Sequence, residues 1–219
     1  MIGLLWSIRG LGKIGRVPAL VGKIRDNHVD FVGIMETKKK EFSSGFLKSL
    51  TWNVPFNWCQ LEAQGTAGGI LVGANSDVFT ITVLEILKFS TSVMLTNKKN
   101  NFSWKLIVIY GPAYEDRKVE FLDELQHIMN SWKGPLLIGG DFNLVRFISD
   151  KSNRQINHRW AALFNNWISK WGLIELSAAN KKFAWTNNQK HRILAKIDRI
   201  FVSTSWEAVT EAAVGLGGL

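Results

Sequence analysis

The feature that most constrains the fold is a short apolar run at residues 136–138, which ends in Gly139 and Gly140. Glycines at the end of a buried strand let another backbone or a ligand come close. Asp141 and Asn143 follow two residues apart, and in an extended chain this spacing places both side chains on one face. The run therefore predicts a buried strand that ends in a carboxylate and an amide, although an ordinary strand and turn would also contain Gly, Asp and Asn.

That pair of side chains suits phosphate chemistry. A carboxylate can orient a water or take its proton, and an amide can donate a hydrogen bond to a phosphoryl oxygen.

Strand-like and helix-like segments alternate along the rest of the chain. Helical spacing of apolar residues appears at 14–24, 121–132 and 156–171, and Gly172 follows the last of these as a C-terminal cap. Apolar or β-branched runs predict strands at 2–8, 29–35, 68–74, 78–95, 104–109, 136–140 and 192–202. We predict one α/β domain over residues 1–219, with two mixed sheets packed face to face and helices outside.

Composition narrows the class of protein. The 219 residues are 46% apolar, and no run is long enough to span a membrane. The start of the chain does not resemble a secretory signal, and the single cysteine, Cys59, fits a reducing compartment. We expect a nuclear or cytoplasmic protein with no membrane association.

The net charge of +9 is concentrated in one segment. Residues 151–199 contain ten Lys or Arg and two Asp or Glu, a balance of +8, which leaves +1 for the remainder. A basic surface confined to one segment indicates a polyanionic partner, most simply nucleic acid, although a solvated basic face is also common. The tryptophans at 160, 167 and 171 keep helical spacing, so we assign them to packing rather than to base stacking.

Polar residues recur at the ends of the predicted strands. They are Ser7 and Arg9, Glu36, Tyr110, Asp141 with Asn143, and Asp198 within the last strand. Strand ends gathered at one sheet edge are where sites are built. Hard oxygen ligands without a His/Cys cluster favour Mg²⁺ over Zn²⁺.

Five ordered motifs resemble the endonuclease/exonuclease/phosphatase superfamily, and in particular the apurinic-like endonuclease domain of plant non-LTR (LINE-type) retrotransposons. They lie at 5–12, 35–38, 110–112, 139–143 and 197–203. The resemblance implies a four-layer α/β sandwich that cleaves phosphodiesters with Mg²⁺ or Mn²⁺. It also implies a role for each matching residue: Glu36 and Ser7 at the metal, Tyr110 at the scissile phosphate, Asp141 at the attacking water, Asn143 at the developing charge, Asp198 orienting a histidine, and Trp185 and Thr186 near DNA. We also expect Arg146, Arg192 and Lys196 to contact DNA.

The sequence departs from the family pattern at two places. The family has Trp-Asn where this chain has Trp6-Ser7, so a metal contact there would weaken or pass through water. The family's terminal Ser-Asp-His motif is absent, and none of His28, His127, His158 and His191 replaces it by position. We therefore expect a domain that is incomplete at the C-terminus and lacks its last strands, with weak or no nuclease activity.

Missing strands would leave a sheet edge unpaired, and such an edge invites self-association or a protein partner.

Other classes of function stay open. A non-catalytic module that binds nucleic acid or protein would keep the basic segment without needing the histidine. A phosphatase for inositol or sphingolipid head groups is the alternative chemistry within the superfamily. The chain would also fit a piece of a longer enzyme.

Overall fold

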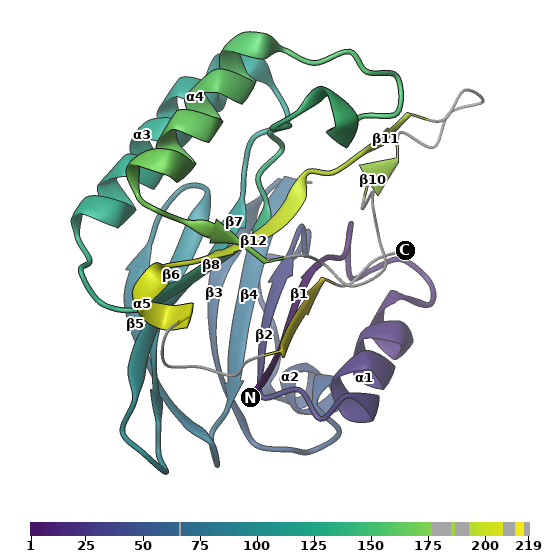
Figure 1. The fold of residues 1–219 in the computed structure, drawn as a ribbon. Helices are drawn as coiled ribbons and strands as arrows, with labels where there is room; N and C mark the ends of the chain where they lie inside the picture. The colour runs from purple at the N-terminus through teal and green to yellow at the C-terminus, as the bar shows by residue number, and fades with distance from the viewer. Residues whose placement is uncertain (66, 177–184, 187–192, 208–212, 217–219) are drawn as a thin grey trace.

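The computed structural model describes residues 1–65, 67–176, 185–186, 193–207 and 213–216, which form two facing sheets with helices around them (Figure 1). The first sheet has the strand order β13–β1–β2–β4–β3, with bounds Ala213–Leu216, Ile2–Ser7, Phe31–Met35, Ala67–Asn75 and Phe56–Gln64. Strand β1 is parallel to β2 and β13, whereas β4 is antiparallel to β2 and β3, so the sheet is mixed.

The second sheet is also mixed. Its strand order is β5–β6–β7–β8–β12–β9, with bounds Phe79–Ile86, Ser90–Asn97, Ser103–Tyr110, Leu136–Asp141, Asp198–Val202 and Ile174–Glu175. Strands β7 and β8 run parallel, and the other neighbours are antiparallel. A short separate pair joins β10 (Trp185–Thr186) to β11 (Leu194–Ala195).

Helices cover the outer faces of both sheets. Residues of α1 (Arg16–Asp26) and α2 (Ser44–Leu50) pack against the first sheet, and residues of α3 (Lys118–Asn130) and α4 (His158–Lys170) pack against the second. Short helical turns lie at Glu115–Arg117, Ile148–Asp150 and, as α5, Thr204–Glu207. The arrangement confirms the expected α/β sandwich of two mixed sheets.

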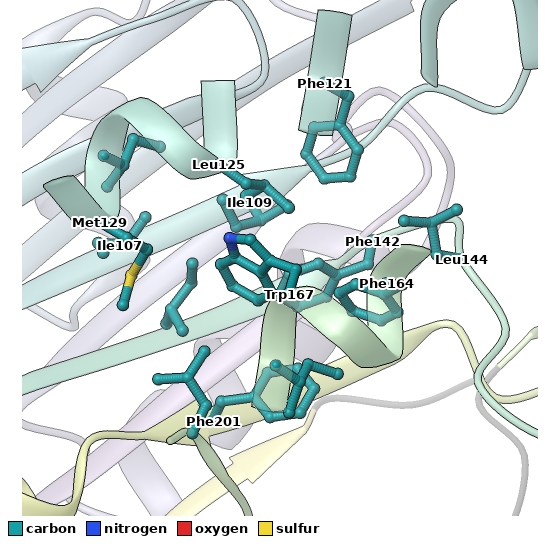
Figure 2. Packing of buried hydrophobic residues seen from close by; sticks show 14 of the residues in the cluster. Ile107, Ile109, Phe121, Leu125, Met129, Phe142, Leu144, Phe164, Trp167 and Phe201 are labelled. Carbon is teal, nitrogen blue, oxygen red and sulfur yellow. The ribbon is translucent and has the colours of Figure 1, made fainter. Parts of the chain in front are cut away.

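Strand alternation divides the core into layers. Ile200 and Val202 of β12 pack between the sheets, whereas Phe201 points to the helical side. Figure 2 shows that layer, where Phe142 and Phe201 meet Phe164 and Trp167 of α4. The centroid of the Phe142 ring lies 5.1 Å from that of Phe164 and 5.5 Å from that of Phe201.

The helical tryptophans behave as the sequence spacing predicts. Trp160 and Trp167 are buried, and Trp171 packs partly buried against the same cluster. Helix α4 ends one residue before Trp171, and Gly172 has a φ of 59°, which is the left-handed conformation of a C-terminal cap.

The structure corrects three details of the predicted elements. Helix α2 and strands β3, β9 and β10 have no counterpart in the sequence analysis. The strand expected at 192–202 is interrupted, because the Lys196 N–H bonds Asp150 O at 2.8 Å and Ile197 O accepts from Phe142 N–H at 3.0 Å. This divides its described part into β11 and β12, and the strand expected at 78–95 is likewise divided, into β5 and β6.

The third correction concerns the last strands. Residues Ala213–Leu216 form β13 and pair in parallel with Ile2–Leu5 of β1, although the sequence analysis expected no strand after β12. The outer edge of β1 is therefore paired. Among the described strands, the long ones at the edges of their sheets are β3 and β5.

Candidate active site

Three polar residues meet where neighbouring strands of the second sheet end. Tyr110, the last residue of β7, is in register with Asp141, the last residue of β8. Asp141 is in turn opposite Asp198, the first residue of β12. Paired residues of adjacent strands point to the same face, so the register brings together a phenol and two carboxyls.

The glycine before Asp141 makes this edge possible. Gly140 has a φ of 138°, and a Cβ added there would lie 2.1 Å from Ile109 O of β7. No other residue fits without moving the neighbouring strand, which confirms the close approach predicted for the glycine pair.

The first sheet contributes charges from the facing edge. Glu36 follows β2 with a left-handed backbone (φ 55°), and its carbonyl oxygen accepts a hydrogen bond from the Gly10 N–H at 2.8 Å. Arg9, after β1, has a φ of 57°. The charges of Glu36 and Arg9 both act on Tyr110, Asp141 and Asp198. The two sheets therefore share one polar cluster at this end, which we call the acid cluster: Arg9, Glu36, Tyr110, Asp141 and Asp198.

Burial raises the pKa of both aspartates. Asp141 is 5% exposed, and burial followed by the charge of Asp198 raises its pKa well above the ordinary value. Burial raises the pKa of Asp198 to about 7, with Arg9 opposing the rise and Glu36 adding to it. Two buried carboxyls on paired positions of adjacent strands resist being ionised together unless a cation binds between them.

Asn143 reaches the acid cluster by a turn rather than by extended alternation. The buried ring of Phe142 anchors the core, and Asn143 then adopts a φ of 50°. Its N–H donates to Asp141 Oδ1 at 2.9 Å, which closes an Asx turn, and its Nδ2 donates to Gly111 O at 2.8 Å. The side-chain amide thus has one N–H left for a ligand.

Two lysines that the sequence analysis did not single out contact the acid cluster or the turn beside it. Lys38 Nζ lies 3.2 Å from Glu36 Oε1. Lys118, the first residue of α3, is buried and donates from Nζ to Asn143 O at 2.8 Å. Burial lowers the pKa of Lys118, while Glu115 and Asp141 raise it. A signal for Lys38 was present in the sequence, because it lies two residues after Glu36, whereas the contact of Lys118 depends on the tertiary fold.

The residues of the acid cluster fit a hard divalent cation. Asp198 Oδ1 and Ser7 Oγ are both buried and have no hydrogen-bond partner within the described part of the chain. Such oxygens, together with the Glu36 carboxylate, are donors that Mg²⁺ and Mn²⁺ accept. Across the described residues, no group of three or more His, Cys, Asp and Glu side chains has a metal-binding arrangement.

The predicted DNA contacts fall into two sets. Arg146 and Lys196 both form ion pairs with Glu175, the latter at 2.7 Å, and lie among buried charges. Trp185 and Thr186 form β10 opposite Ala195 and Leu194. Arg192 lies outside the described residues, as does His191.

The described histidines lie away from the acid cluster. His127 Nε2 is 3.1 Å from Glu85 Oε1 of β5, His28 lines a cavity beside Trp52, and His158 begins α4. Within the described residues, Asp198 therefore has no imidazole to orient.

Comparison with known protein families assigns the fold. The sequence pattern of the Endonuclease/Exonuclease/phosphatase family matches residues 6–218. The chain belongs to the endonuclease/exonuclease/phosphatase family. No protein of curated function matches this member of the family significantly.

Solved structures share the endonuclease/exonuclease/phosphatase fold at low identity. The endonuclease domain of TRAS1, a telomere-specific non-LTR retrotransposon, is 13% identical with a TM-score of 0.68, and the match covers 94% of this chain and 86% of that one. An AP endonuclease from Archaeoglobus fulgidus is 10% identical with a TM-score of 0.67, covering 91% and 86%. D. rerio TDP2, complexed with single-strand DNA product, is 13% identical with a TM-score of 0.64, covering 94% and 85%. In the described part of the chain, no helix is long and apolar enough to cross a membrane.

Proposed function

We propose that residues 1–219 act as one metal-dependent domain that cleaves phosphodiesters in DNA as an endonuclease, at a low rate. The observation that carries the proposal is the register that places Asp141 between Tyr110 and Asp198, with the charge of Glu36 acting on all three. Three similar structures, a retrotransposon endonuclease, an AP endonuclease and TDP2 with a DNA product, support DNA as the substrate. A retrotransposon origin of the domain is part of the proposal.

Glu36 would hold Mg²⁺ or Mn²⁺, with Ser7 Oγ contributing directly or through water. When bound, such an ion polarises the phosphoryl oxygen and favours the ionised carboxylates. Ionised Asp141 then orients the attacking water and accepts its proton.

Tyr110 and Asn143 would act on the phosphate itself. Burial, Glu36 and Asp141 raise the pKa of the Tyr110 phenol, so the hydroxyl stays protonated and donates to a phosphoryl oxygen. The free amide N–H of Asn143 donates to the charge that develops in the transition state.

The low rate follows from the surroundings of Asp198. In the described residues no histidine adjoins it, so the carboxyl has no base to orient; without a bound ion, burial also raises its pKa to about 7. General acid–base groups contribute about 10²- to 10⁴-fold to catalysis, and we expect a deficit of that order.

Nicking of supercoiled plasmid tests the proposal. We expect slow nicking in Mg²⁺ or Mn²⁺, none in EDTA, and none for the double variant Glu36→Gln/Asp141→Asn. The matched control is Asp77→Asn, an exposed carboxylate in the turn before β5, which should nick like the unmodified chain. Nicking that persists in the double variant would refute the site, and fast nicking that the double variant abolishes would refute only the low rate. A screen for phosphate release from inositol and sphingolipid head groups separates the phosphatase alternative.

A second candidate is a non-catalytic module that binds nucleic acid. The raised pKa of both aspartates favours it, because protonated carboxyls repel a phosphate less than ionised ones do. In the basic segment of residues 151–199, Lys196 pairs with Glu175 and Arg199 pairs with Asp150. The phosphates would therefore bind other Lys and Arg side chains of that segment. Binding through phosphates weakens steeply with salt, so binding without nicking and with a steep salt slope would favour this module.

A further inference from the structure

A cavity beside the acid cluster has no part in the proposed chemistry. Its volume is about 220 Å³, and it lies between the β3–β4 hairpin and the segment after β7, with Tyr110 and Gly111 in its wall. Ligand pockets for whole drug-sized molecules are about 300–1,000 Å³. The cavity therefore suits one ring system of a larger ligand whose other part lies at Tyr110.

Backbone hydrogen bonds fix the cavity relative to Glu36. The Lys38 N–H donates to Gly68 O at 3.1 Å, and the Thr37 N–H donates to Gly69 O at 3.2 Å. A Cβ on Gly69 would lie 2.2 Å from Thr37 Oγ1, so this contact requires glycine. A ligand in the cavity would consequently sit at a constant distance from the catalytic carboxylates.

The lining favours a flat, uncharged group. Leu61, Ile70, Phe89 and Pro112 give apolar walls, and Tyr114 is an aromatic side chain in the same lining that is 77% exposed.

The cations at the cavity are already engaged. Lys88 Nζ lies 2.6 Å from Glu120 Oε1. The Arg117 guanidinium carbon lies 4.9 Å from the centre of the Phe89 ring, and Nε lies 3.8 Å from Glu120 Oε2. A phosphate would have to compete with Glu120 for both cations, whereas an aromatic ring would meet Tyr114 and the apolar walls without disturbing them.

We infer that the cavity binds an unstacked nucleobase next to the phosphodiester held at Tyr110. This inference rests on the proposed function, because it places that phosphodiester at the acid cluster. A base inside a regular duplex must leave its stack to enter, and this cost is smallest for single-stranded, mismatched or damaged DNA. The chain therefore prefers single-stranded or distorted DNA over intact duplex.

Binding measured without cleavage tests the inference. Fluorescence anisotropy in EDTA would compare a single-stranded oligonucleotide, the same strand as a duplex, and a single strand of abasic spacers. Tyr114→Ala should weaken binding of the single strand about tenfold, since stacking on an aromatic side chain is worth that order of affinity. It should change binding of the abasic strand by less than about twofold.

Two further variants test the cavity: one fills it, and the other removes an aromatic side chain elsewhere. Ala113→Leu, at the same wall, should also weaken binding of the single strand but not of the abasic strand. Trp52→Ala removes an aromatic side chain of similar exposure that lines a different cavity, and should leave binding unchanged.

The outcomes separate this inference from the proposed function. Equal loss on base-containing and abasic strands, or no loss for Tyr114→Ala, overturns the nucleobase site even if plasmid nicking succeeds. Selective loss on the base-containing strand with no nicking in Mg²⁺ or Mn²⁺ retains the nucleobase site and overturns the proposed cleavage.

Discussion

Asp198 and Arg199 are neighbours in β12, yet they lie in opposite electrostatic surroundings. Asp198 joins the acid cluster, where burial and, to a smaller extent, the charges of neighbouring carboxylates raise carboxyl pKa values. Arg199 is 1% exposed and bonds Asp150 Oδ2 at 2.6 Å and Glu175 Oε1 at 2.7 Å. We call the second region the ion-pair network: Arg146, Asp150, Glu175, Lys196 and Arg199.

The comparison shows how one strand serves two purposes. In the ion-pair network every charge has an opposite partner, and Lys196, Arg199 and Arg146 lower the pKa of Glu175 against the effect of its burial. In the acid cluster Glu36 pairs with Lys38, but within the described residues neither Asp141 nor Asp198 forms an ion pair. The ion pairs stabilise the position of the strand. Buried carboxylates without an ion pair have an unfavourable electrostatic free energy, which binding of a cation or a substrate can lower.

The largest expected effect breaks the network. Arg199→Met leaves the buried Asp150 without its cation and removes one of three cations from the half-buried Glu175, so the free energy of unfolding should fall by about 3–5 kcal/mol. Urea denaturation measures it. The control Arg25→Met removes an exposed cation paired with Asp26 and should change stability by no more than about 0.5 kcal/mol. A loss for Arg199→Met no larger than the control's would contradict the assigned role of the network.

The pH dependence of stability sharpens the comparison. Asp198 has a pKa of about 7 in the folded chain against an ordinary 3.8, so the folded state binds the extra proton between these values. The free energy of unfolding should therefore fall as pH rises from about 4 to 7, by an amount on the order of a few kcal/mol. Denaturation in EDTA should show a smaller fall for Asp198→Asn.

Glu175→Gln is the control of opposite sign for this titration. The folded pKa of Glu175 is lowered, so its carboxylate contributes stability at neutral pH, and that contribution is lost as pH falls through the folded pKa. The variant should be destabilised most at neutral pH and least in acid. A difference between the unmodified chain and Asp198→Asn that stays constant from pH 4 to 7 would be inconsistent with the titration assigned to Asp198.

The smallest expected effect concerns Lys38, which competes with a divalent cation for Glu36. Lys38→Gln should lower the Mg²⁺ concentration at half-saturation by about two- to fivefold, as expected for loss of a partly exposed ion pair. The thermal shift in a Mg²⁺ titration measures this without requiring cleavage. Lys99→Gln, in the exposed β6–β7 loop, is the control, and weaker Mg²⁺ binding by Lys38→Gln would mean that Lys38 supports the ion rather than opposing it.

The acid cluster was predictable because its members end strands. Tyr110, Asp141 and Asp198 follow or begin apolar runs, and adjacent strands of one sheet bring such ends together. The turn at Asn143 was left open as an alternative to an extended chain, because an Asx turn and an extended chain contain the same residues.

The ion-pair network was not predictable from the same pattern. Arg146 and Lys196 were interpreted as DNA contacts from their place in the sequence, and their role at DNA stays a prediction. Their pairing with Glu175 requires three segments to meet in space: the loop after β8 that contains Arg146, strand β9 that contains Glu175, and the segment before β12 that contains Lys196. Strand β13 was missed for a related reason: its parallel pairing with β1 joins residues from opposite ends of the chain.

The left-handed backbone at Arg9, Glu36 and Asn143 has a consequence for how this domain can be stabilised. Glycine would relax each of these positions, yet it would also delete a charge of the acid cluster or the Asn143 amide beside it. Selection for heat tolerance alone would therefore replace Arg9, Glu36 and Asn143 first. A thermally stable descendant would retain the two-sheet sandwich and lose the polar side chains of the acid cluster.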